Sequence, residues 1–218
     1  MANEQHTLPK TLTEAFQARV AELPDAIALR TTGEEMPLTW SEYGRRVQSI
    51  AAGLADLGVR TGDRVAIMLA DRPEFDLFDN ALLHLGAAPV SVSTTFSQEQ
   101  IRHLLADSAA TVVVTEGQFV QRLREAGLES VNYVVTIEGS ADAADPEDRV
   151  FLSLEELEAN PAPDFDFDAA WRAVTPENVA TVIYAADDTG ILEAVEVTHA
   201  SALATRSSTS PLVGADLD

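Results

Sequence analysis

The sequence contains no cysteine, which excludes disulfide bonds, thiolate nucleophiles and cysteine-ligated zinc sites. Lysine is almost missing as well, because Lys10 is the only one and all other basic residues are arginines. Chemistry that needs a mobile ammonium group would therefore have to use Lys10. No hydrophobic run approaches the roughly 18 residues of a membrane-spanning helix, and the first residues lack the apolar core of a signal peptide.

Positive charge is scarce overall, since 14 Lys and Arg residues face 36 Asp and Glu residues, a formal net charge of −22. Binding to nucleic acid or to an anionic membrane surface needs a basic surface, and the largest basic cluster is the pair Arg45 and Arg46. A hydrophobic content of 46% is nevertheless that of a folded chain. We expect an acidic, cytoplasmic protein that binds no nucleic acid and inserts into no membrane.

Short apolar segments alternate with amphipathic ones along most of the chain. Helical spacing of apolar residues and end signals predict helices over 11–23, 41–57, 73–85, 98–108 and 118–126, a short one over 154–157, and one that starts near His199. Apolar runs predict strands over 26–30, 37–40, 64–69, 88–92, 111–115, 133–137, 179–184 and 194–198. Strands that are apolar nearly throughout and separated by helices predict an α/β fold, with a mainly parallel sheet flanked by helices on both faces.

Three local features carry further expectations. Ser41 is a candidate N-cap for the second helix. His84 lies beside leucines on a predicted helix, and we expect it at the surface or half-buried. Aromatic residues lie at the end of the proline-rich link over 160–168 and just after it, and we expect them to hold the link against the sheet: Phe165, Phe167 and Trp171.

Five strings stand out along the chain: LTWSEY (38–43), GVRTGDRVAIMLADRPEF (58–75), LHLGAAPVSVSTTFSQEQIRHLLADS (83–108), DFDFDAAWRAVTPENVATVIY (164–184) and VEVTHAS, which ends at Ser201. In this order and spacing they resemble the adenylate-forming (AMP-binding) enzymes, and most of all bacterial long-chain fatty-acyl-CoA synthetases. The resemblance covers about residues 7–206. It implies the fold of the N-terminal part of such an enzyme's large lobe, with 1–206 as a single domain, incomplete relative to the family, and 207–218 as a disordered tail.

Enzymes of this family use Mg-ATP to convert a carboxylic acid into an acyl-adenylate and then pass the acyl group to coenzyme A. Their phosphate loop reads T-S-G-T-T-G-x-P-K-G, whose backbone N–H groups, hydroxyls and lysine bind the triphosphate. The resemblance places this loop at Ala185 to Ala194, which here reads AADDTGILEA. Only Thr189 and Gly190 match, and they are the only cofactor-binding candidates that the sequence offers.

The mismatched positions reverse the charge of the loop. Asp187 stands in place of a glycine, Asp188 in place of a hydroxyl donor and Glu193 in place of the lysine, so a formal charge of about +1 in the family becomes −3. Two unit charges about 6 Å apart at an effective dielectric near 20 interact by roughly 3 kcal/mol. The change therefore opposes phosphate binding by about 10 kcal/mol before screening, more than the roughly 8 kcal/mol of a micromolar affinity.

Two interpretations of these acidic residues remain open. Asp and Gly suit the turn of a hairpin between two strands. The alternative is a cation site formed by Asp187, Asp188 and Glu193, because carboxylates suit Mg²⁺ or Ca²⁺. His199 belongs to the family's Thr-His pair, and we expect Thr198 to cap the following helix and His199 to be packed, with a catalytic role as the alternative.

The expected function is that of a non-catalytic, truncated homologue or fragment of a long-chain fatty-acid–CoA ligase. We expect no catalytic residue, no metal and no cofactor here, whereas the intact family uses ATP, Mg²⁺ and CoA. The chain would act through self-association as a homodimer or through a protein partner such as a full-length relative. The alternative is a folded part of a fatty-acid–CoA ligase, active in acyl activation once a missing segment or partner chain completes it.

Overall fold

The computed structural model describes residues 8–30, 37–138, 150–186 and 192–209. Its helices are α1 (Leu12–Glu22), α2 (Trp40–Asp56), α3 (Pro73–Leu85), α4 (Gln98–Ser108), α5 (Gly117–Ala126), α6 (Leu154–Ala159), α7 (Phe167–Ala173) and α8 (His199–Thr209). Its strands are β1 (Ile27–Leu29), β2 (Leu38–Thr39), β3 (Arg64–Met68), β4 (Ala88–Ser91), β5 (Val112–Thr115), β6 (Tyr133–Thr136), β7 (Val150–Ser153), β8 (Val179–Ala186) and β9 (Leu192–Thr198).

The main sheet has the strand order β7-β6-β5-β3-β4-β8-β9. All neighbouring strands in it are parallel except β8 and β9, which are antiparallel. The expected mainly parallel sheet is therefore confirmed. The chain moves from β3 to β4 on one side and then returns to place β5 on the other side of β3. The direction of winding thus reverses between β3 and β5, whose carboxyl ends flank the position where open α/β sheets commonly bind ligands.

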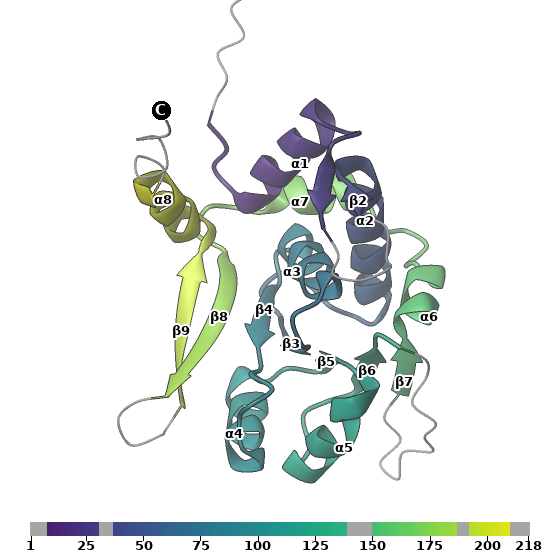
Figure 1. Ribbon diagram of the computed structural model, residues 1–218, viewed down its shortest axis with the longest axis vertical. Helices are drawn as coiled ribbons and strands as arrows, with labels where there is room; N and C mark the ends of the chain where they lie inside the picture. The colour runs from purple at the N-terminus through teal and green to yellow at the C-terminus, as the bar shows by residue number, and fades with distance from the viewer. Residues whose placement is uncertain (1–7, 31–36, 139–149, 187–191, 210–218) are drawn as a thin grey trace, which may run out of the picture.

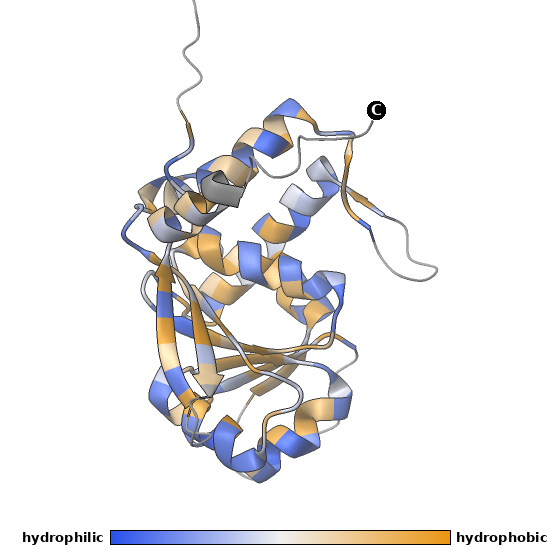
Figure 2. Ribbon diagram, turned by 60° about the vertical axis from the view of Figure 1, so that its left-hand side comes forward, coloured by the Kyte–Doolittle hydropathy of each residue, from blue (hydrophilic) through white to orange (hydrophobic). Residues whose placement is uncertain are grey.

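Helices cover both faces of this sheet. Figure 1 shows α1, α2, α3 and α7 above it and α4 and α5 below it. The alternation along β3 matches the two layers, since Val65 and Ile67 belong to the core on the α2 and α3 side, and Ala66 and Met68 to the core on the α4 and α5 side. Figure 2 shows the strands as the most hydrophobic part of the molecule. None of the helices within the described residues has the length and apolar character needed to span a membrane.

The second helix begins earlier than expected. Ser41 is not its N-cap, because the helix starts at Trp40 and Thr39 caps it. The Thr39 hydroxyl accepts from the Glu42 backbone N–H at 3.3 Å, and the Glu42 carboxylate accepts from the Thr39 N–H at 2.9 Å. This reciprocal capping box needs Glu or Gln three residues after the cap. Thr39 has one, whereas Ser41 is followed at that distance by Gly44.

The prediction for His84 was wrong, because its side chain is fully buried. Its ring stacks on Phe167 at a centroid distance of 5.2 Å and meets Phe16 edge-on at 5.1 Å. Phe167 is the first residue of α7, so the aromatic cluster holds the end of the 160–168 link against helix α3 and not, as expected, against the sheet. The neighbours that bury His84 come from α1 and α7, which are remote in sequence.

Two elements were missed, the edge strand β7 and the helix α7. Strands β8 and β9 extend two residues further toward each other than expected. Helix α8 continues to Thr209, beyond the domain boundary expected at residue 206. The acidic segment over 139–148 and the last part of the expected tail, 210–218, lie outside the described residues.

Candidate functional site

The segment Ala185 to Ala194 has both of its ends in paired strands. Strands β8 and β9 run antiparallel, with Ala185 opposite Glu193 and Ala186 opposite Leu192. The pairing makes β8 and β9 the two arms of a hairpin. The residues between the arms lie outside the described part of the chain, among them the acidic pair and the two matching positions: Asp187, Asp188, Thr189 and Gly190.

One face of the hairpin is fixed to the body of the protein. The Tyr184 hydroxyl donates to Asp107 of α4 at 2.7 Å, and burial followed by this hydrogen bond raises the pKa of Tyr184. A ring nitrogen of His103 donates to the Leu192 carbonyl at 3.2 Å. Glu196 forms an ion pair with Arg64 of β3. The guanidinium that reaches the hairpin from β3 is therefore already held by a carboxylate.

The other face of the hairpin is exposed and apolar at its centre. Ile183 and Val195 lie directly opposite each other in the register, and their side chains are 48% and 52% exposed. Glu193 is also exposed, next to the end of β9. This face combines an uncovered hydrophobic pair with an acidic residue, and it offers no cation for a triphosphate among the residues described.

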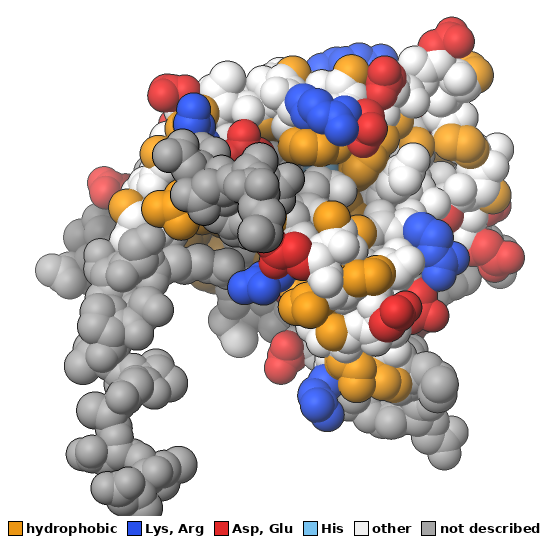
Figure 3. Space-filling view, turned by 90° about the horizontal axis from the view of Figure 1, so that it is seen from above, with side chains coloured by type: hydrophobic (Ala, Val, Ile, Leu, Met, Phe, Trp, Pro, Cys, Tyr) orange, Lys and Arg blue, Asp and Glu red, His pale blue; other side chains and the backbone are white. Residues whose placement is uncertain are grey.

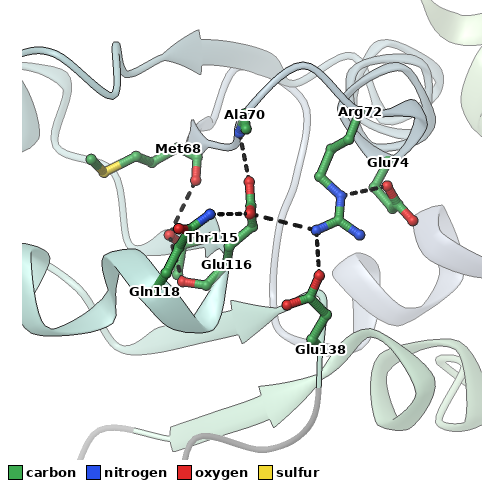
Figure 4. Close-up of polar contacts among 8 residues, drawn as sticks. All are labelled: Met68, Ala70, Arg72, Glu74, Thr115, Glu116, Gln118 and Glu138. Carbon is green, nitrogen blue, oxygen red and sulfur yellow. Dashed lines mark hydrogen bonds and ion pairs between the residues drawn. The ribbon is translucent and has the colours of Figure 1, made fainter. Parts of the chain in front are cut away.

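The crevice between the carboxyl ends of β3 and β5 holds a network of charged groups (Figure 4). Arg72, the residue before α3, donates from Nε to Glu74 at 2.7 Å and from Nη1 to Glu138 at 2.8 Å. Its Nη1 also lies 3.7 Å from a carboxylate oxygen of Glu116. Burial raises the pKa of Glu74, but the hydrogen bond and charge of Arg72 outweigh it and hold that pKa below its ordinary value.

Glu116 connects the strands at this crevice. One carboxylate oxygen accepts from the Ala70 backbone N–H at 2.6 Å, and the other accepts from the Gln118 side chain at 2.6 Å. The Thr115 hydroxyl donates to the Met68 carbonyl at 3.1 Å. The backbone N–H that could bind a phosphate here is thus used by a carboxylate of the chain itself. The crevice is an internal ion-pair network and not an anion site.

His199 connects α8 to the start of the chain. Its Nδ1 accepts from the Leu12 backbone N–H at 3.1 Å, and its own backbone N–H donates to the Asn178 carbonyl. The Thr198 hydroxyl accepts from the Ser201 N–H at 3.2 Å, so the expected cap is confirmed. The side chain of His199 is fully buried, as expected, and its Nε2 has no hydrogen-bond partner among the residues described. Burial lowers the pKa of His199.

The β8–β9 hairpin and the Arg72 network differ in whether they could be predicted from the sequence. The hairpin was predicted from its turn residues and the apolar strands on either side, whereas the Arg72 network was missed, because its carboxylates come from three separate segments. Within the described ranges, no group of three or more His, Asp or Glu side chains is arranged to hold a metal ion. Glu193 stands on an exposed strand end where a triphosphate would need a cation. Among the described residues of the hairpin, none supplies a free cation for a triphosphate.

Comparison with known proteins gives consistent matches. A family model described as "AMP-binding enzyme" matches residues 16–216. Uncharacterized protein Rv1549 of Mycobacterium tuberculosis is 41% identical over 135 residues, which are 62% of this chain and 77% of that protein. Long-chain-fatty-acid–CoA ligase FadD15 of Mycobacterium bovis is 33% identical over 168 residues, which are 75% of this chain but only 27% of the ligase.

A solved structure shows the same relation. The putative long-chain-fatty-acid CoA ligase of Rhodopseudomonas palustris superposes with a TM-score of 0.75 at 25% identity, covering 92% of this chain and 47% of that one. The chain thus spans about half or less of the length of these two ligases. The match accounts for the sheet order, the helical layers and the position of the hairpin in one fold.

Proposed function

The chain belongs to the family of AMP-binding enzymes, and on that premise we propose that it is a non-catalytic counterpart of the N-terminal part of a long-chain fatty-acid–CoA ligase. On its own it does not bind ATP productively and forms no acyl-adenylate. The observation that carries the proposal is the acidic composition of the segment at the family's phosphate-loop position.

Electrostatics supports the proposal. A triphosphate at the hairpin would meet Glu193 on β9 and the two aspartates between the strands. Three repulsions and one lost attraction oppose binding by about 10 kcal/mol before screening. Arg64, which reaches the hairpin from β3, does not offset this repulsion, because it is already paired with Glu196. Removing that pair to bind a phosphate would leave another carboxylate without its cation.

Association is the second part of the proposal. The exposed pair Ile183 and Val195 forms an apolar centre on a sheet face. Burial of such a surface against another protein is favourable. We propose a second copy of this chain or a longer relative as the protein that covers it. The same observation favours the alternative, in which the chain is a folded part of a fatty-acid–CoA ligase and a further segment covers this face.

A calorimetric titration with Mg-ATP tests the first part. The unchanged chain is compared with a repaired one that carries Thr-Ser-Gly-Thr at 185–188 and Pro-Lys-Gly at 192–194. A control with the same change in net charge carries Asp25→Asn, Glu155→Gln and Glu177→Lys, all at exposed sites. We expect heat of binding from the repaired chain alone. Micromolar binding by the unchanged chain would overturn the proposal.

Light scattering over a range of protein concentrations tests the second part. We expect a dimer that dissociates when Ile183 and Val195 are both changed to serine. The control is Val150→Ser, which removes a valine that is 49% exposed on β7. A monodisperse monomer at high concentration contradicts self-association. A complex that forms only with a full-length ligase then favours the heteromeric form of the proposal.

A further inference from the structure

A cleft of about 430 Å³ lies where α2 and α3 end. Its apolar lining comes from three helices and includes Ala55, Leu85 and Ala170. Its volume is within the range of sites that bind small molecules, roughly 300–1,000 Å³. The cleft shares no residue with the β8–β9 hairpin or with the Arg72 network. It carries one base and one acid, Arg60 and Asp164.

Arg60 is fixed in place at the end of α2. Its Nη1 donates to the Ala55 carbonyl at 2.7 Å and to the Val59 carbonyl at 2.8 Å. In the described part of the chain, no carboxylate pairs with this guanidinium. Its remaining N–H groups are therefore available to a ligand, and a held guanidinium is well suited to a carboxylate.

Asp164, which also lines the cleft, belongs to a turn between α6 and α7. The Phe165 N–H donates to the Ala162 carbonyl at 3.2 Å, which closes the turn, and the Ala162 N–H donates to the Ala52 carbonyl of α2 at 3.1 Å. The Asp164 carboxylate has no hydrogen bond or ion pair with any described residue, Arg60 included. The carboxyl-terminal ends of α2 and α3 are both at the cleft, and helix ends of this polarity favour a cation.

We infer that this cleft binds a zwitterionic amino acid with an apolar side chain. The ligand's carboxylate pairs with Arg60, its ammonium group pairs with Asp164, and its side chain packs against Ala55, Val59 and Leu85. A ligand with only a carboxylate would leave Asp164 unbalanced next to a negative charge. A ligand with only an ammonium group would leave the Arg60 guanidinium without a partner next to a positive charge. The inference is independent of the function proposed above.

The test uses the full chain with labelled methyl groups and three probes that share the 2-methylpropyl group of leucine. L-Leucine carries both charges, 4-methylpentanoate only the carboxylate, and 3-methylbutylamine only the ammonium group. We expect leucine to shift the methyl resonances of Ala55, Val59 and Leu85 in a saturable way. Because each analogue lacks one charge pair, it should bind about tenfold more weakly or worse, a loss of about 1.4 kcal/mol or more.

Two variants locate the charges. Asp164→Asn should weaken leucine binding about tenfold and leave 4-methylpentanoate binding equal or stronger. Arg60→Met should weaken leucine binding about tenfold and leave 3-methylbutylamine binding equal or stronger. Because Arg60 also caps α2, Arg60→Lys, which keeps the positive charge, is the check on that structural role. Asp25→Asn, at an exposed acid outside the cleft, should change nothing. Equal binding of all three probes, shifts spread over the surface, or no saturable shift with leucine would each overturn the inference.

Discussion

At the scale of single residues, His84 is a buried histidine that the fold keeps neutral. Its Nδ1 donates to the Asn80 carbonyl at 2.7 Å, so its Nε2 accepts from the Gln17 side chain at 3.0 Å. Burial, with a further contribution from the charge of His199, lowers the pKa of His84 to about 4. In the unfolded chain its pKa is near 6.5. Between these two values the unfolded state binds a proton that the folded state does not.

The free energy of unfolding should therefore fall as the pH falls through 6.5 toward 4. Linkage gives a loss of about 2 kcal/mol from this residue between neutral pH and pH 5. Urea unfolding at the two pH values checks this, with His84→Gln as the variant that no longer titrates. The difference in pH dependence between the unchanged chain and the variant isolates His84 from the carboxylates.

Arg72 is the cation on which two buried carboxylates depend. The side chains of Glu74 and Glu116 are 11% and 7% exposed. Replacing Arg72 with methionine removes the ion-pair partner of both carboxylates, so we expect a loss of about 3 kcal/mol in unfolding free energy at neutral pH. Arg172→Met is the matched control, because its ion pair with Asp168 is exposed to solvent, and we expect a much smaller loss there. Equal losses in chemical denaturation would show that the network adds nothing.

These two residues also show where sequence reasoning ended at this scale. The cap at Thr198 could be predicted, since a cap is decided within three or four residues. The burial of His84 could not be predicted, because the residues that cover this face of α3 come from α1 and α7, which are remote in sequence. The partners of Arg72 could not either, since Glu116 and Glu138 follow strands that become neighbours only in the folded sheet.

At the scale of elements, α2 and α6 approach closely at a glycine. A Cβ atom at Gly53 would lie 2.3 Å from the backbone oxygen of Leu157. Gly53→Ala must therefore separate the two helices, and we expect a loss of about 1–3 kcal/mol in unfolding free energy. Gly117→Ala is the control, because it is also helical and a Cβ there meets nothing within 4 Å. That change should be neutral or stabilising by up to about 1 kcal/mol, so calorimetric melting should move the two variants in opposite directions.

The elements that the sequence predicted share a property that the missed ones lack. Strands β3 and β5 are buried on both faces, so their apolar runs are continuous and easy to identify. Strand β7 lies at the edge of the sheet, and its first residue, Val150, is exposed. Helix α7 is seven residues long and begins within the proline-rich link. Both depend on tertiary contacts for their stability more than on a local pattern.

At the scale of the whole molecule, the fold and the candidate site were predictable to different degrees. The parallel sheet and its two helical layers follow from the alternation of buried strands and helices, and the comparisons place the chain in one family. The hairpin was predicted from its turn residues and the apolar strands on either side, and the resemblance placed the family's phosphate loop at the same segment. The argument against phosphate binding there rests on the charges of its acidic residues, which the sequence supplies, because the residues at its tip lie outside the described part of the chain.

The net charge of −22 is the property that acts on the whole molecule at once. Figure 3 shows basic side chains lying next to acidic ones on the upper face, but with 14 basic residues against 36 acidic ones most carboxylates have no cation. Their mutual repulsion destabilises the compact state. Salt screens it, because the Debye length falls from about 30 Å at 0.01 M to about 8 Å at 0.15 M.

We therefore expect the melting temperature to rise with sodium chloride. The same salt weakens the ion pairs, but the exposed ones contribute about 0–1 kcal/mol each and are few, whereas the repulsion involves most of the surface. For a chain of this size each kcal/mol gained at the midpoint raises the melting temperature by about 2–4 °C. Differential scanning calorimetry between 0.01 and 0.5 M salt measures the slope. A fall in melting temperature with salt would mean that attraction within ion pairs such as the Arg72 network outweighs the repulsion due to the net charge. Because Arg72→Met removes that network, the melting temperature of this variant should then rise with salt.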